Sequence, residues 1–242
     1  MALLSGEGFL LVLRWLHLLA GITWIGLLYY LNFVQAPFFT KADPMVRSGM
    51  VGGGHLERVL WWFRWGAKAT FVSGWLIILH RIGLGGFFDS SYGWIILFGG
   101  LIGTLMWANV WFVIWPKQRV VIASVQQVQS GGRAIPAAAT AGFRASVTSR
   151  TNVMLSIPLL FFMGAASHLP VGPIHGPRAL SVLLGVLLLA GVNALIGSVE
   201  PGKAAYIPLA HCYPGAPEQL NREEVLAKLK PWLENPAAKK LG

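Results

Sequence analysis

The feature that most constrains the fold is the long apolar run Leu10–Phe33, near the start of the chain. With a rise of about 1.5 Å per residue, a helix of this run reaches about 36 Å, and the hydrocarbon core of a membrane is about 30 Å thick. The chain is 55% hydrophobic, only 12% charged, and contains 11 tryptophans. Together these features indicate an integral membrane protein rather than a soluble domain.

Four further apolar runs follow, and we predict that each crosses the membrane as a helix. The predicted fold is an all-α integral membrane protein, a five-helix transmembrane bundle over residues 1–198 with a short cytoplasmic tail over residues 199–242. One short amphipathic helix, Arg222–Leu233, is expected within the tail. The predicted spans cover residues 10–33, 59–80, 92–115, 151–169 and 179–197.

The third run carries two expectations about its packing and its end. Gly99 and Gly103 have the GxxxG spacing that permits close contact with a neighbouring helix. Pro116 is predicted to end this helix, because proline interrupts the helical hydrogen-bond ladder. The polar and basic stretch 117–150 is expected to contain two short helices that do not cross the membrane.

Basic residues are distributed unevenly about these spans. With five crossings, 14 of the 19 Lys and Arg residues lie on the side of the tail, two lie on the N-terminal side, and three lie within spans. The positive-inside rule therefore places the N-terminus outside and the tail in the cytoplasm. The net charge of +10 is explained by anionic lipid headgroups and requires no nucleic-acid partner.

The first span carries one face of functional interest. Arg14, His17, Gly21 and Trp24 follow a 3-4-3 spacing, so they share one side of a helix. Ionisable groups are costly in lipid, and we expect this face to point toward a protein interior or a bound group. We therefore predict Arg14, His17 and Trp24 as cofactor-binding residues.

The second span is unusual because Arg64 and Lys68 lie inside it, one turn apart. In one interpretation their stems run along apolar surface and their charged heads reach the interface. In the other they form a cationic pocket for a carboxylate, a haem propionate or an anionic substrate. Both residues are predicted as cofactor-binding.

The histidines suggest a cofactor. His17, His80 and His168 all fall in the outer half of the predicted bundle or at its outer boundary. Two imidazoles from different helices can bind haem iron axially, and we predict haem b with His17 and His168 as ligands and His80 as an alternative. Arg14, one turn from His17, is suitably placed for a propionate.

Several other classes of function lose support. No acidic residue lies within a predicted span, which disfavours proton relays and ion pumps. The single cysteine, Cys212, excludes an internal disulfide, a CxxC metal site and a CxxCH haem site within this sequence. The sequence has no Walker A loop and no HExxH motif.

Four segments in the same order resemble the membrane domain of the bacterial urate hydroxylases, the urate oxidase N-terminal family. The resemblance covers about two-thirds of the chain and favours as site residues His17, Trp24, Arg64, Lys68 and His168. It implies a short form without the C-terminal cytochrome c domain of that family, which would carry electrons away from urate oxidation. The segments are Arg14–Gly26, Trp61–Trp75, Pro116–Ser124 and Ser149–His168.

We therefore expect a multi-pass protein of the bacterial cytoplasmic (inner) membrane that binds haem b and acts in electron transfer. If the chain is an enzyme, it is a membrane-bound oxidoreductase. Expected partners are the lipid bilayer and a cytochrome c or a larger membrane complex. The alternative is a non-catalytic accessory subunit that docks or stabilises such a complex, with the basic tail as the docking element.

Overall fold

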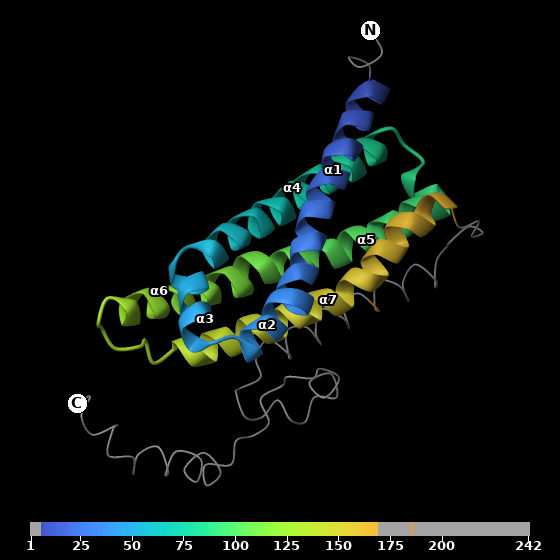
Figure 1. Ribbon diagram of the computed structural model, residues 1–242. Helices are drawn as coiled ribbons and strands as arrows, with labels where there is room; N and C mark the ends of the chain where they lie inside the picture. The colour runs from blue at the N-terminus through green and yellow to red at the C-terminus, as the bar shows by residue number, and fades with distance from the viewer. Residues whose placement is uncertain (1–5, 169–184, 186–242) are drawn as a thin grey trace, which may run out of the picture. The chain divides into compact units, whose positions relative to one another are not determined.

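The computed structural model describes residues 6–168 and Gly185, and every regular element within them is helical (Figure 1). The all-α fold class is thereby confirmed for this part of the chain. Apart from Gly185, the predicted fifth span and the predicted tail lie outside the described residues. The elements are α1 (Gly6–Tyr29), the π-helical turn η2 (Tyr30–Gln35), α2 (Ala36–Lys41), α3 (Pro44–Gly52), α4 (His55–Gly83), the 3-10 turn η3 (Phe87–Asp89), α5 (Ser91–Ala108), the π-helical turn η4 (Asn109–Ile114), α6 (Trp115–Gln129) and α7 (Ala138–His168).

Three continuous helices among the described residues are long and apolar enough to cross a membrane. They are Gly6–Lys41, Ser91–Gln129 and Ala138–His168, with 36, 39 and 31 residues. Helix α4 contains the predicted second span and has 29 residues, but with Arg64 and Lys68 inside it α4 is not one of these three. The five-span bundle therefore stays a prediction.

Pro116 does not end the third helix, contrary to the prediction. Helix α5 passes through η4 directly into α6, whose first turn contains Pro116. The same arrangement occurs earlier, where η2 leads into α2 with Pro37 in its first turn. A π-helical turn changes the hydrogen-bond register, and a proline lacks only an N–H that is dispensable in a first turn. The two helices therefore continue past their prolines.

The helices also extend beyond the apolar runs that predicted them. Helix α6 continues to Gln129, and α7 begins at Ala138 rather than at Thr151. Hydropathy marks the length of a membrane crossing, whereas a helix ends where its hydrogen-bond ladder ends. The stretch 117–150 is helical on both sides of a break between α6 and α7, as predicted, but its helices continue the predicted third and fourth spans instead of being separate short ones.

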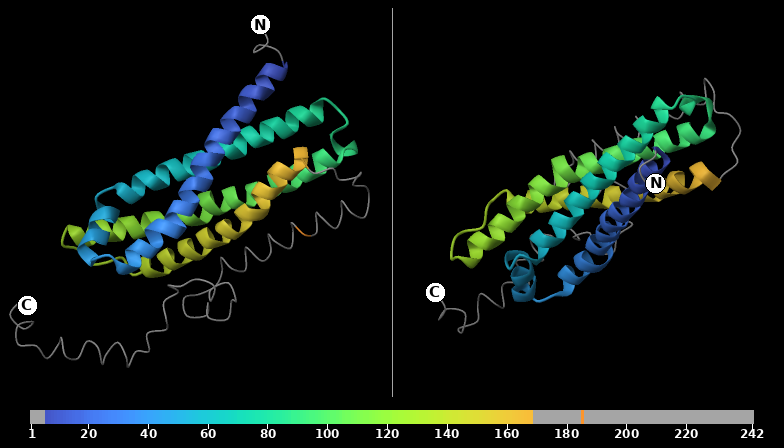
Figure 2. Two further views of the ribbon diagram at one scale, coloured as in Figure 1. Left: turned by 45° about the vertical axis from the view of Figure 1, so that its right-hand side comes forward. Right: turned by 90° about the horizontal axis from the view of Figure 1, so that it is seen from above.

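Two helix pairs dominate the packing: α1 on α4, and α5 on α7 (Figures 1 and 2). In Figure 1, α1 crosses α4 obliquely. The crossing is close at Gly66, where a Cβ would lie 3.3 Å from the backbone nitrogen of Trp24. In the second pair Gly99 and Gly103 face side chains of α7, which confirms the close contact predicted from their spacing.

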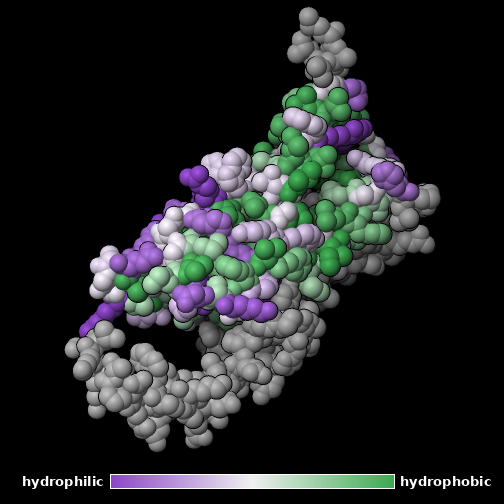
Figure 3. Space-filling model, viewed as in Figure 1, coloured by the Kyte–Doolittle hydropathy of each residue, from purple (hydrophilic) through white to green (hydrophobic). Residues whose placement is uncertain are grey.

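The largest buried cluster lies between these pairs and draws on α1, α4, α5, η4 and α7. The outward surface, in contrast, is strongly apolar, and in Figure 3 hydrophobic side chains dominate the visible part of α1. Such a surface suits lipid better than water. The most buried large members of the cluster are Trp24, Leu28, Phe63, Ile102, Met106 and Val110.

Candidate functional site

His17 lies at the seam between α1 and α4. Its Nδ1 is 2.9 Å from the backbone carbonyl oxygen of Thr70 and 3.2 Å from Oγ of Ser73, both on α4. Because a carbonyl oxygen can only accept, Nδ1 is the protonated nitrogen and Nε2 carries the lone pair. Among the described residues no group hydrogen-bonds to this Nε2. Metal-binding histidines are commonly oriented in this way, through the ring nitrogen that does not bind the metal.

The imidazole of His17 rests in a notch at Gly74. A Cβ at this position would lie 2.8 Å from Cε1 of His17 and 3.2 Å from Nδ1, closer than side-chain contacts allow. Glycine therefore leaves the space that the ring occupies. The sequence identified His17 as a candidate but gave no indication that Gly74 belongs to its surroundings.

His80 lies along the same seam. Its ring meets Phe9 of α1 edge to face, with the ring centres 6.2 Å apart. Six residues separate Gly74 from His80, which corresponds to about 9 Å along the helix axis. The structure therefore brings His17 and His80 to one helix pair. Arg14 is exposed, one turn before His17 on α1.

Two other predicted site residues, His168 and Trp24, do not lie beside the imidazole of His17. His168 is the exposed last residue of α7, and its Nδ1 donates to the carbonyl of Gly164 within its own helix at 2.9 Å. Trp24 is only 1% exposed and belongs to the hydrophobic core, where no described residue hydrogen-bonds to its Nε1. Packing in the core is thus what the structure shows for Trp24.

Arg64 and Lys68 form a cluster with three tryptophans. The guanidinium carbon of Arg64 is 4.0 Å from the ring centre of Trp115 and 5.4 Å from that of Trp111. The ammonium nitrogen of Lys68 is 4.8 Å from the ring centre of Trp65 and 5.3 Å from that of Trp111. These are cation–π distances, so the two charges are held between α4 and the η4–α6 segment by indole faces.

A buried amide pair joins the α5–η4 helix to α7, and the sequence did not identify it as a pair. Asn109 Nδ2 donates to Oδ1 of Asn152 at 2.8 Å, and Asn152 Nδ2 donates to the carbonyl of Met106 at 3.0 Å. Asn152 is fully buried. An asparagine inside an apolar run is the only signal that the sequence gives, and it does not reveal which partner it meets.

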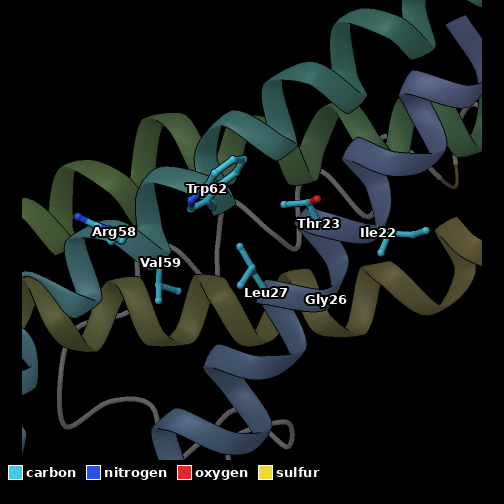
Figure 4. Close-up of a pocket in the computed structure, with 7 residues that line it drawn as sticks. All are labelled: Ile22, Thr23, Gly26, Leu27, Arg58, Val59 and Trp62. Carbon is cyan, nitrogen blue, oxygen red and sulfur yellow. The ribbon is translucent and has the colours of Figure 1, made fainter. Parts of the chain in front are cut away.

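The α1–α4 seam is flanked by open apolar hollows. One, of about 420 Å³, also has a charged residue, Arg58, in its wall (Figure 4). Its lining residues are Ile22, Thr23, Gly26 and Leu27 from α1 and Arg58, Val59 and Trp62 from α4. A second, of about 740 Å³, is a groove along the same two helices. Its lining residues are Leu13, Leu16, Leu19, Ala20, Thr23, Trp61, Trp62, Trp65, Gly66, Ala69, Val72, Ser73 and Leu76.

A third cavity, of about 430 Å³, has a more polar lining. The sequence did not predict this cavity. It lies among η2, α3, α6 and α7, and its wall includes Asn32, Gln35, Gln118 and Ser149. Asn32 Nδ2 donates to Ser149 Oγ at 2.8 Å, which links η2 to α7. Gln35 is 5% exposed, and its Oε1 accepts no hydrogen bond from the part of the chain that the structure describes. No group of three or more His, Cys, Asp or Glu side chains within residues 6–168 could hold a metal ion.

Within the described residues, these features show the class of the protein. It is all-helical, three of its helices are long and apolar enough to cross a membrane, and polar side chains lie between its helices. A family model described as "Urate oxidase N-terminal" matches residues 86–196. This match confirms the resemblance predicted from the sequence for that part of the chain. It begins after α4, so His17, Arg64 and Lys68 lie outside the matched segment.

Two further comparisons add little about function. The chain is 58% identical over 45 residues to DNA polymerase I of Pseudomonas aeruginosa, which is 19% of this chain and 5% of that protein. Since the match spans only a twentieth of the polymerase, it does not extend polymerase activity to this chain. No solved structure matches the chain.

Proposed function

We propose that the chain is a membrane protein related to the membrane domain of the urate hydroxylases, that it has a redox role, and that His17 is an axial ligand of haem b. The geometry of His17 is the observation that carries the proposal. Its Nδ1–H is held by the Thr70 carbonyl on the neighbouring helix, and its Nε2 is left with a lone pair. Haem, when bound, supplies one-electron chemistry, and the chain contributes the orientation of the ligand.

The second ligand in this proposal is His80 or His168. Helix pairing supports His80, which shares the α1–α4 seam with His17. The prediction from the sequence was His168, and its Nδ1 bond to Gly164 leaves Nε2 of that residue in the same state as Nε2 of His17. Arg14, one turn before His17 on α1, is the cation that would hold a propionate, through a salt bridge to its carboxylate. Arg64 and Lys68, which the sequence predicted as cofactor-binding, instead face Trp111 of η4.

The proposed setting is the bacterial cytoplasmic membrane, crossed five times with the N-terminus outside. Three helices of sufficient length and hydropathy support membrane insertion. The bond from Gln129 Nε2 to the Ser48 carbonyl, at 3.0 Å, supports the proposed sidedness, because it joins the last residue of α6 to the middle of α3, which lies between the first two predicted spans. Basic residues before, within and after those helices thereby gather at one end of the bundle, as the positive-inside rule requires of the cytoplasmic side.

The experiment is a dithionite-reduced minus oxidised spectrum of the full chain, purified in mild detergent from cells supplied with haem precursor. The expected result is the α band of a b-type haem, lost in His17→Ala and kept in His55→Ala, whose side chain is exposed at the start of α4. An absent band, or a band that persists unchanged in His17→Ala, would refute the proposal.

Electron transfer also requires a partner, and we propose a cytochrome c or a larger membrane complex for that role. Native mass measurement after gentle extraction distinguishes the redox role from the accessory role. A haem-containing particle reduced or oxidised by added cytochrome c supports the redox proposal. A haem-free chain retained in a larger particle supports the alternative, an accessory subunit.

A further inference from the structure

The cluster of Arg64, Lys68 and three tryptophans has an unbalanced charge. Arg119 lies four residues after Trp115, on the same face of α6, and its charge acts on that of Arg64. The four acidic residues of the described part are Glu7, Asp43, Glu57 and Asp89, and none of them forms an ion pair with Arg64, Lys68 or Arg119. Three cations thus lie together, and no carboxylate within residues 6–168 neutralises them.

The indole contacts stabilise these cations only in part. A cation–π contact contributes roughly 0.5–2 kcal/mol, depending on how far the charge is removed from water. The contacts also leave the donors of Lys68 and the terminal nitrogens of Arg64 without protein acceptors among the described residues, and Arg64 Nε is buried with no hydrogen-bond partner. An oxyanion would supply both the missing charge and the missing acceptors.

The surroundings of the cluster identify the kind of molecule that carries this oxyanion. Trp65 contacts both cations and also lines the apolar groove of about 740 Å³ between α1 and α4. Trp61 and Trp65, 46% and 39% exposed, form the wall of the groove near the cations. One amphiphilic ligand would therefore suit both features, with its charged head beside the cations and its hydrocarbon chain in the groove.

We propose that Arg64, Lys68 and Arg119 bind the phosphate of an anionic phospholipid, whose acyl chain lies in the groove between α1 and α4. Basic pockets between membrane helices on the cytoplasmic side are suited to such headgroups, and tryptophans are favoured at that depth. The proposal depends on membrane insertion, as part of the proposed function, but not on haem.

The test uses the full chain in nanodiscs of phosphatidylglycerol and phosphatidylcholine, followed by gentle release and native mass measurement of the retained lipid. We expect phosphatidylglycerol to be retained in preference. Arg64→Met and Lys68→Met should each lower this preference about fivefold, and Arg119→Met should lower it also. Lys41→Met, which removes an exposed charge from α2, should leave it unchanged. Equal retention of both lipids by the wild-type chain, or an unchanged preference in the Arg64 and Lys68 variants, would overturn the proposal.

Two further measurements separate lipid binding from misfolding and from binding of a free anion. Arg64→Lys keeps the charge, so it should retain most of the preference even if Arg64→Met folds poorly. Inorganic phosphate added in excess should not displace the lipid, and displacement would assign the site to a free oxyanion and overturn the lipid proposal. If the chain were found in the soluble fraction of lysed cells instead of in the membranes, membrane insertion itself would be refuted. That failure is distinct from a loss of lipid preference in nanodiscs.

Discussion

The α5–α7 seam and the α1–α4 seam both place polar side chains between helices, but they leave those side chains in different states. At α5–α7 the fully buried side chain of Asn152 donates through Nδ2 to the backbone carbonyl of Met106 and accepts at Oδ1 from Asn109. At α1–α4, His17 is half-buried, and only its Nδ1 is bonded to α4. A polar group with its bonding satisfied holds a fold together, whereas one with a spare lone pair can also bind a ligand. The first seam therefore serves to hold two helices together, whereas the second keeps a ring nitrogen that is able to bind a ligand.

The largest effect on stability is expected from breaking the satisfied pair. Asn152→Leu removes both hydrogen bonds that the Asn152 side chain makes, from Asn109 Nδ2 and to the Met106 carbonyl, at the centre of the packed helices, which costs about 1–3 kcal/mol. Thermal unfolding of the detergent-solubilised chain measures it. Met154→Leu, at an exposed position two residues along α7, is the control and should unfold with the wild type. If Asn152→Leu were equally stable, the amide pair would not be what holds this seam.

An intermediate effect is expected from filling the notch beside His17. Gly74→Ala places a methyl group where the imidazole lies, so the ring should move and its bond to Thr70 should break. Alanine favours helix over glycine by up to about 1 kcal/mol, so the stability of the chain should change little while the ring is displaced.

The ¹⁵N chemical shifts of the histidine side chains report this displacement, because they distinguish the bonded Nδ1–H from a free ring. Gly83→Ala at the end of α4 is the matched control, since a Cβ there meets nothing within 4 Å. A His17 signal unaffected by Gly74→Ala would contradict the geometry of the α1–α4 seam.

The smallest effect is expected from the side chains that line the Nδ1 contact. The acceptor is the backbone carbonyl of Thr70, so Thr70→Val keeps it, and Ser73→Ala removes only the longer 3.2 Å contact. Interhelical hydrogen bonds in membranes average about 0.6 kcal/mol. Each variant should therefore change the unfolding free energy by about 0.5 kcal/mol or less and keep the histidine signals of the wild type. A change above about 1 kcal/mol in Thr70→Val would show that the side chain, rather than the carbonyl, holds the imidazole.

Periodicity predicted that the face with His17 points toward the protein interior, and His17 does contact α4, but the other residues of that face differ in their surroundings. Along that face Arg14 is exposed, His17 and Gly21 are half-buried, and Trp24 is in the core. Leu10 and Leu13 are buried although they lie farther along α1 from Trp24 than His17 does, so the covered stripe continues past Arg14 and leaves that residue at its edge. Residue spacing describes which side chains share a face, but not where the partner helix meets it.

Two other features required the structure for a similar reason. The sequence predicted a helix end at Pro116, because it does not show that η4 shifts the hydrogen-bond register before the proline. The pairing of Asn109 with Asn152 depends on the register between two helices that are far apart in the chain. Composition and hydropathy, in contrast, were sufficient to predict the all-helical class, because they do not depend on how distant helices pack against each other.

The central claim is that Nε2 of His17 binds haem iron, and rescue by imidazole tests it most directly. His17→Gly leaves space for a free imidazole in the notch beside Gly74. We predict that His17→Gly loses the b-type α band or shifts it, and that added imidazole restores the wild-type spectrum. Full retention of the wild-type band in His17→Gly without imidazole would contradict the claim.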